Sequence, residues 1–266
     1  MNRILDYIVN SIIYWSGGDL IIVAFLAGSI AAVLTFLGAL PALAGKRMSD
    51  KFMDAAMGFS GGVMITASFT SLIFPALEAG PFTNVVVGFS LGAIAIFLAD
   101  RFLPHEHLIK GFEGSEALRS RLKAAWLIAI AIIIHNFPEG LAIGSSMSFD
   151  IELGVITAIA IGIQDIPEGL AVALPLAGIE GKVGKALALA ALSGIVEPLM
   201  ALIPPLLVEQ SILLLPYILS FAAGAMVYVV SHEVIPETHR HGFEGEATLG
   251  FLLGFLLMLS LDTLLG

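Results

Sequence analysis

The chain has 266 residues, of which 58% are hydrophobic and only 13% are charged. A soluble domain needs about 25% charged residues because its surface faces water, so the composition excludes a soluble protein and indicates an integral membrane protein. The formal net charge of −10 argues against nucleic acid as a partner. The absence of cysteine excludes disulfides, thiolate metal sites and thiol chemistry.

Residues 4–15 form the first apolar stretch, but Asp6 and Asn10 interrupt it. A bilayer core needs about 20 apolar residues in helical form, so this segment is predicted to be an interfacial helix or an extension of the first span. It lacks the basic start and the cleavage site of a signal peptide.

Eight later stretches are long enough to cross a bilayer, and their continuous apolar character favours helices over barrel strands. The sequence therefore predicts one all-α transmembrane domain over residues 1–266. The eight predicted spans cover about 20–43, 55–77, 82–99, 124–147, 153–179, 186–207, 212–235 and 247–265.

The basic residues are divided unevenly between the two sides of this predicted bundle. Only Arg3 lies on the side of the termini. Because cytoplasmic loops carry an excess of Lys and Arg, the sequence predicts extracytoplasmic termini and a cytoplasmic loop over 100–123. The other eleven lie in loops after alternate spans: Lys46, Arg47, Lys51, Arg101, Lys110, Arg119, Arg121, Lys123, Lys182, Lys185 and Arg240.

The predicted spans contain acidic residues but no Lys or Arg. An isolated carboxylate in the membrane interior costs about 2.5–3.5 kcal/mol even on lenient insertion scales, so these groups must be protonated, hydrated or neutralised by a bound cation. The six acids are Glu139, Asp165, Glu168, Glu197, Glu233 and Asp262, and His135 and His232 accompany them.

Four spans are predicted to bring polar or sulfur ligands to one level near the bilayer midplane, where secondary transporters build their sites. Within spans 4 and 5 these residues are spaced three and four apart, so they share one helix face. Asp165 and Glu197 are either ligands or groups that only tune proton binding, and Met64 is either a ligand or a packing residue. The candidate ligands are Met64, His135, Asn136, Glu139, Gln164, Asp165, Glu168 and Glu197.

Proline interrupts the same helices beside these ligands. Pro138 frees the backbone carbonyl of Ile134, Pro167 frees that of Ile163, and Pro198 follows Glu197 directly. Unsatisfied backbone at this depth is tolerated only where it lines a cavity or a site. The pattern is therefore typical of a transport pathway.

An internal repeat links the two central spans. HNFPEGLAIG at 135–144 aligns with QDIPEGLAVA at 164–173, and one loop separates the spans, so the two copies run antiparallel. Such an inverted repeat is expected to bring Glu139 and Glu168 together at the midplane. Facing carboxylates flanked by His, Asn, Gln and Asp suit one or two divalent metal ions.

A second set of metal-ligand residue types is predicted at the cytoplasmic ends of spans 3 and 7 and in the adjacent loop. The histidines of the 100–123 loop are equally compatible with an ordinary solvated loop. Together these residues form a possible exit site for a metal ion: Asp100, His105, His107, His232, Glu233 and His239.

Two other functions also place histidine or acidic residues inside a membrane. An intramembrane metalloprotease is excluded because Asn136 and Pro236 interrupt the spacing of two histidines around a glutamate. A proton-coupled carrier of another small solute stays as the alternative, although the predicted site offers no aromatic or basic contact for such a substrate. The chain is not expected to be an enzyme or to hold a cofactor.

The motifs HNFPEG and IQDIPEG, followed by SGIVEP and SHEVIPETH, resemble those of the ZIP (Zrt/Irt-like) family of divalent metal transporters. Gln164, where many members have histidine, makes the chain similar to the GufA-like bacterial branch. The resemblance implies a 3+2+3 helix arrangement with inverted repeats, zinc uptake across the cell (inner) membrane, and a homodimer with an elevator-like motion. Without a histidine at 164, cadmium, iron or manganese are also possible substrates.

The resemblance further implies a binuclear site between spans 4 and 5. One metal ion would be held by His135, Glu139, Gln164 and Glu168, with Met64 nearby. The second ion would be held by Asn136, Glu139, Asp165, Glu168 and Glu197.

Overall fold

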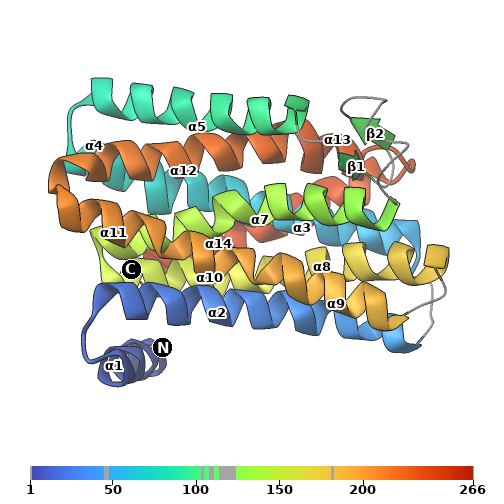
Figure 1. Ribbon diagram of the computed structural model, residues 1–266, viewed down its shortest axis with the longest axis horizontal. Helices are drawn as coiled ribbons and strands as arrows, with labels where there is room; N and C mark the ends of the chain where they lie inside the picture. Colours follow the sequence, from blue (N-terminus) through green and yellow to red (C-terminus); the bar gives the residue numbers. More distant parts are fainter. Residues whose placement is uncertain are drawn as a thin grey trace.

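The computed structural model describes residues 2–44, 48–102, 105–107, 111–113, 124–180 and 183–265. The described chain forms a bundle of long helices that run along one common axis, with the first helix lying across one end of the bundle (Figure 1). Both termini lie toward that end, and the short strands lie at the opposite end (Figure 1).

The first half of the chain contains three long helical segments. The second of them changes from an α-helix to a π-helix and back again without a loop. The elements are α1 (Asn2–Ser16), α2 (Leu20–Ala39), η1 (Leu40–Ala44), α3 (Asp50–Ala67), η2 (Ser68–Ile73), α4 (Phe74–Ala79) and α5 (Phe82–Phe102).

The second half begins with two uninterrupted helices and continues with segments that are broken into shorter pieces. Another π-helix, η4, interrupts the segment before the last helix. The elements are α7 (Ala124–Phe149), α8 (Ile151–Glu180), α9 (Val183–Gly194), α10 (Val196–Ala201), α11 (Ile203–Gln210), η3 (Ile212–Leu214), α12 (Leu215–Val229), η4 (Val230–Val234), α13 (Ile235–Thr238) and α14 (Glu244–Leu265).

Seven helical segments among the described residues are long and apolar enough to cross a membrane. They agree with seven of the eight predicted spans. Helix α7 covers the remaining predicted span, but only its side chains from Ile133 onward belong to the described part of the structure. The seven segments are Leu20–Leu43, Asp50–Ala79, Phe82–Phe102, Ile151–Leu174, Val183–Gln210, Ile212–Thr238 and Glu244–Leu264.

Helix α1 is separate from the first span. Gly17 and Gly18 have positive φ angles of 65° and 80°, a conformation that glycine adopts without steric cost. Asp19 then caps α2 by accepting hydrogen bonds from the backbone amides of Ile21 and Ile22. The two glycines turn the chain, so α1 does not extend the first span.

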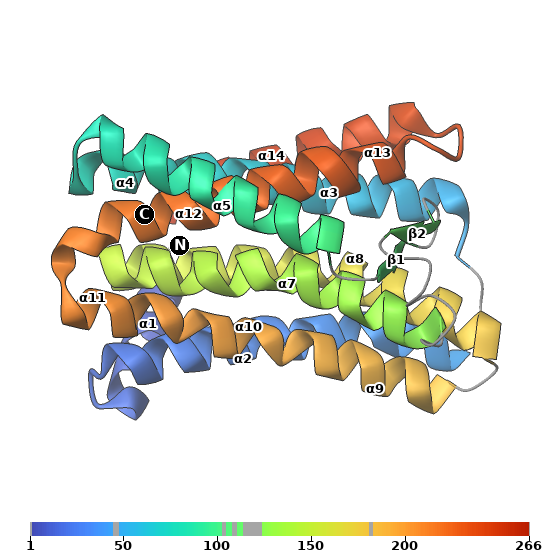
Figure 2. The same cartoon turned by 45° about the horizontal axis from the view of Figure 1, so that its top comes forward.

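The helices pack in two neighbouring groups. Figure 2 shows α2 and α7–α11 on one side and α3–α5 and α12–α14 on the other. The most extensive pairings, α2 with α8, α3 with α14 and α5 with α12, all lie within a group. At the α3–α14 crossing a side chain on Gly62 would overlap the carbonyl oxygen of Phe251, and one on Gly254 would overlap that of Phe59. Backbone-to-backbone contact at small residues is how helices associate in membranes.

The predicted cytoplasmic loop 100–123 contains a small element that the all-α prediction did not include. Strands β1 (His105–His107) and β2 (Gly111–Glu113) pair antiparallel, with His105 opposite Glu113. Three-residue strands are too short to leave a periodic pattern in the sequence. The rest of this loop beyond Phe102 lies outside the described residues.

Candidate metal centre

Four buried carboxylates gather where α7, α8 and α10 meet. The side chains of Glu139, Asp165, Glu168 and Glu197 are each no more than 8% exposed. One oxygen from each of Glu139, Asp165 and Glu168 lies within 4.8 Å of the others, which is close enough for these three residues to hold one metal ion. The structure therefore brings together the acids that the internal repeat pairs.

The glycines of the repeat explain why neighbouring helices can reach this cluster. In α7, a side chain on Gly140 would meet the carbonyl oxygen of Glu197, so α10 packs directly against the backbone of α7. In α8, Gly169 takes the equivalent place and faces the carbonyl oxygen of Thr35 in α2. Each copy of the Pro-Glu-Gly sequence thus supplies one glutamate, and its glycine lets one further helix pack closely. That helix is α10 for the first copy and α2 for the second.

Amide and hydroxyl donors hold one oxygen of three of the carboxylates. Gln164 Nε2 donates to Glu139 Oε1 at 2.5 Å and to Asp165 Oδ1 at 2.7 Å. Asn136 Nδ2 and Thr35 Oγ1 both lie within hydrogen-bond distance of Glu197 Oε1, at 2.9 and 3.0 Å. These bonds determine which carboxylate oxygens remain for another partner.

The remaining oxygens are buried and have no hydrogen-bond partner among the described residues. A buried oxygen without a partner costs free energy, and five such atoms in one place are exceptional. Oxygen donors in this number, several of them from carboxylates, suit a divalent cation. The atoms are Glu139 Oε2, Gln164 Oε1, Asp165 Oδ2, Glu168 Oε1 and Glu197 Oε2.

His135 lies at the edge of this group of carboxylates. Its side chain is 17% exposed, and Nδ1 lies 3.6 Å from Oε2 of Glu233, which belongs to η4. The group of three close acids does not include His135. His135, a predicted midplane ligand, therefore lies next to Glu233, which is predicted from the sequence to belong to the exit site.

Met64 is fully buried in α3. One turn earlier, Ser60 Oγ donates to the backbone carbonyl of Gln164 at 2.8 Å. Residues four apart share a helix face, so Met64 lies on the face of α3 that packs along α8. This placement is compatible with both predicted roles, ligand and packing residue.

The predicted exit residues do not form one group in the described structure. His232 Nε2 lies 3.1 Å from Asp100 Oδ2, and Tyr228 donates to the same oxygen at 3.4 Å. Glu233 turns toward His135, and Nδ1 of His239 bonds the carbonyl of Ile235 within its own helix. The side chains of His105 and His107 lie outside the described residues.

Several polar contacts were not anticipated from the sequence. Thr35 and Ser60 lie in apolar spans that contain other hydroxyl residues, and they differ from these in what they contact: Thr35 lies against Glu197, and Ser60 bonds the backbone carbonyl of Gln164. Asp262, one of the six acids of the predicted spans, is held by the hydroxyls of Thr70 and Ser71 in η2. The only sign of this contact in the sequence is that Asp262 is a carboxylate in an apolar span, which needs polar partners.

The long apolar helices and the carboxylates buried between them define the class of protein, an integral multi-pass membrane protein with an acidic cluster inside its helix bundle. Comparison with known proteins makes the assignment specific. The chain belongs to the ZIP family, since residues 104–262 match the family model described as ZIP Zinc transporter. This confirms the resemblance and, because the family consists of transporters, the expectation that the chain is not an enzyme.

Similar proteins extend this agreement over most of the chain. Zinc transporter ZIPB of Bordetella bronchiseptica is 46% identical over 256 residues, covering 91% of this chain and 81% of the relative. Zinc transporter GufA of Myxococcus xanthus is 43% identical, covering 91% of this chain and 98% of the relative. Zinc transporter ZIP11 of Homo sapiens is 33% identical, covering 81% and 89%.

Proposed function

We propose that the protein carries divalent metal ions, zinc foremost, across the cell (inner) membrane into the cytoplasm. The single observation that carries this proposal is the set of five buried oxygens without hydrogen-bond partners among the described residues, on helices that contribute four carboxylates. Two divalent ions would balance four ionised carboxylates. The printed names of the relatives support zinc as the substrate.

The proposed site is binuclear. The first ion is held by His135, Glu139, Gln164 and Glu168, with Met64 nearby. The second is held by Asn136, Glu139, Asp165, Glu168 and Glu197. Gln164 supports this assignment because its amide nitrogen is engaged, which leaves its oxygen as the donor toward a cation.

The proposed topology has eight spans in a single domain, with a 3+2+3 arrangement and both termini outside the cytoplasm. The described basic residues Lys51, Arg101, Lys185 and Arg240 support it, because they lie at the ends of helices that meet at one end of the bundle (Figure 1). Both termini lie toward the other end. Such a division matches the excess of basic residues on cytoplasmic surfaces.

Transport by alternating access needs the site to open to each side in turn, and we propose that a homodimer performs it. The division of the helices into two groups supports a motion of one group against the other (Figure 2). Two pairs of residues offer successive ligands to an ion that leaves toward the cytoplasm. The first pair is His135 with Glu233, and the second is Asp100 with His232.

The function is tested by uptake into proteoliposomes of zinc, cadmium, iron and manganese. Glu139→Ala and Glu168→Ala should each reduce uptake of every transported metal to the level of empty vesicles, since each glutamate is shared by both ions. Glu209→Ala, an exposed carboxylate at the end of α11, is the matched control and should transport normally. Uptake that survives both site substitutions contradicts the site, and the absence of flux for all four metals contradicts the function and favours a carrier of another solute.

A further inference from the structure

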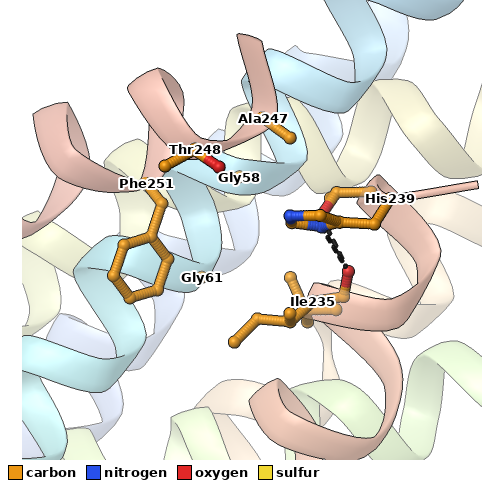
Figure 3. A pocket seen from close by; sticks show the side chains of 9 residues that line it. Gly58, Gly61, Ile235, His239, Ala247, Thr248 and Phe251 are labelled. Carbon is orange, nitrogen blue, oxygen red and sulfur yellow. Dashed lines mark hydrogen bonds between the residues drawn. The ribbon is translucent and has the colours of Figure 1, made fainter. Parts of the chain in front are cut away.

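A pocket of about 190 Å³ lies between α3, α13 and α14, apart from the acidic cluster (Figure 3). Its walls come from small residues on α3 and from larger apolar side chains on the other two helices. The residues that line it are Gly58, Gly61, Val234, Ile235, Thr238, His239, Ala247, Thr248 and Phe251.

Gly58 and Gly61 form the α3 wall of the pocket, next to close contacts with neighbouring elements: a side chain on Gly58 would overlap the carbonyl oxygen of Ala247, and one on Gly61 would press against Val234. Protein interiors leave few voids larger than a water molecule, so an apolar hollow of this size is filled by a molecule from its surroundings. An apolar cavity of about 150 Å³ in a soluble protein is large enough for benzene. This pocket therefore has room for a segment of an alkyl chain.

The surroundings are lipid, because the pocket opens beside the exposed face of α14. Thr248 is exposed at the edge of the pocket, and Leu249, Leu252 and Leu253 continue this face with exposed fractions of 62%, 51% and 63%. Exposed leucines on a membrane-spanning helix contact acyl chains. The pocket is thus a side recess of a lipid-facing surface.

Its depth places it close to the membrane surface. Gly58 follows the first residue of α3 by eight residues, roughly 12 Å along the helix axis. At this end of the bundle Lys51 pairs with Glu246 at 2.8 Å, and His241 Nδ1 lies 2.9 Å from Asp54 Oδ1. Charged groups therefore lie just beyond the pocket, at the end of the bundle where the proposed topology puts the cytoplasm.

His239 gives the pocket a polar edge. Its Nδ1 lies 2.9 Å from the carbonyl oxygen of Ile235 and 3.0 Å from Thr238 Oγ1, and these contacts hold the ring in place beside the cavity (Figure 3). The other ring nitrogen, Nε2, is then the one available to an external group. Arg240, the next residue, is exposed and adds a positive charge.

We propose that this pocket binds a glycerophospholipid of the leaflet on the side of the basic loops. Part of an acyl chain occupies the apolar cavity between Ile235 and Phe251, and the phosphate lies beside His239 and Arg240. Basic pockets between membrane helices on the cytoplasmic side bind anionic head groups in this way, so anionic phospholipids are preferred over zwitterionic ones.

The position of the pocket connects lipid binding to the proposed transport. Val234 and Ile235 in its wall directly follow Glu233, whose carboxylate lies 3.6 Å from His135. A bound acyl chain restrains this segment and therefore the contact between η4 and the candidate metal centre. This consequence rests on the proposed function, whereas the binding of lipid does not.

The experiment uses the full-length protein in liposomes that contain a trace of phospholipid with a diazirine in its acyl chain, with either a phosphatidylglycerol or a phosphatidylcholine head group. After illumination, mass spectrometry measures labelling of Ile235 and Phe251 relative to Leu252 and Leu256, which are exposed on the lipid-facing side of α14. We expect at least fivefold more label at the pocket residues, and more from phosphatidylglycerol.

Two variants and a matched control make the test specific. Thr248→Phe fills the cavity from its edge and should reduce pocket labelling about fivefold, whereas Leu252→Phe on the same helix should not. The double variant His239→Ala, Arg240→Ala should retain labelling but remove the preference for phosphatidylglycerol. Pocket labelling no higher than at Leu252, or equal labelling in Thr248→Phe and Leu252→Phe, overturns the proposal. Glu139→Ala should leave labelling unchanged, which separates this result from failure of the transport proposal.

Discussion

Gln164 Nε2 bridges Glu139 Oε1 and Asp165 Oδ1, at 2.5 and 2.7 Å, and so joins the two copies of the internal repeat through one amide group. The amide donates to both carboxylates, while its own oxygen is buried and has no hydrogen-bond partner among the described residues. Gln164 therefore links α7 to α8, and in the proposed site its oxygen would complete the set of donors.

Gln164→His should shift the metal preference of the protein. An imidazole nitrogen favours zinc over manganese, which prefers carboxylate and carbonyl oxygens, so the ratio of zinc to manganese uptake is expected to rise about tenfold, equivalent to about 1.4 kcal/mol. Competitive uptake in proteoliposomes measures this ratio. Gln164→Glu, which retains an oxygen donor, serves as the control, and an unchanged ratio in Gln164→His would show that this residue does not contact the ion.

Thr35→Val should weaken metal binding although Thr35 is not a proposed ligand. Its hydroxyl lies 3.0 Å from Glu197 Oε1 and 3.1 Å from the Ala31 carbonyl of its own helix, so these two acceptors share its one hydrogen. Loss of an outer partner of a metal ligand typically costs about 10- to 100-fold in metal affinity. Calorimetric titration of the purified protein with zinc should show a decrease of about tenfold. Thr35→Ser should restore the affinity.

Thr66→Val is the matched control for Thr35→Val: Thr66 is also buried and, like Thr35, can bond a carbonyl of its own helix, but it bonds no carboxylate among the described residues. Equal zinc affinities for the two valine variants would mean that the contact between Thr35 and Glu197 does not orient a metal ligand.

Gly254→Ala should lower the stability of the bundle. The added methyl group would overlap the carbonyl oxygen of Phe59 and force α3 and α14 apart, and overpacking of this kind costs about 1–3 kcal/mol. Thermal unfolding in detergent should show a lower midpoint than for the unmodified protein. Gly245→Ala on the same helix meets no atom within 4 Å, so it should leave the midpoint unchanged or raise it. A midpoint that does not distinguish the two variants argues against close packing at this crossing.

Helix α1 is expected to lie at the extracytoplasmic surface of the cell membrane, without crossing the bilayer. Its 15 residues span about 22 Å, less than a bilayer core of about 30 Å, and Tyr14 and Trp15 are both 80% exposed. Aromatic side chains of this kind anchor helices at the level of the head groups. In a Trp126→Phe background, which leaves Trp15 as the single tryptophan, phospholipids brominated near the head group should quench fluorescence more than those brominated near the chain end. Stronger quenching by the deep bromines would indicate an inserted helix.

The sequence predicted the long helices and most of the acidic cluster correctly, for local reasons. Glu139 and Glu168 belong to repeated segments in which residues three and four apart must share a face. The contributions of α2 and α3 were not predictable in this way, because nothing local shows which side of an apolar helix Thr35 or Ser60 occupies. The π-helices η2 and η4 were also missed, since no residue type by itself specifies them.

Composition and pattern by themselves determined that this protein belongs in a membrane, where its helices lie, and that its interior charges are acidic. These properties depend on the cost of placing polar groups in lipid, which each residue bears regardless of its neighbours. Only the tertiary structure decided which oxygens of these acids accept hydrogen bonds and which do not. It engages one oxygen each of Glu139, Asp165 and Glu197 with Gln164, Asn136 and Thr35, and leaves other buried oxygens without hydrogen-bond partners among the described residues. That selection depends on close helix approach at Gly140 and Gly169, a contact between distant segments that no local pattern specifies.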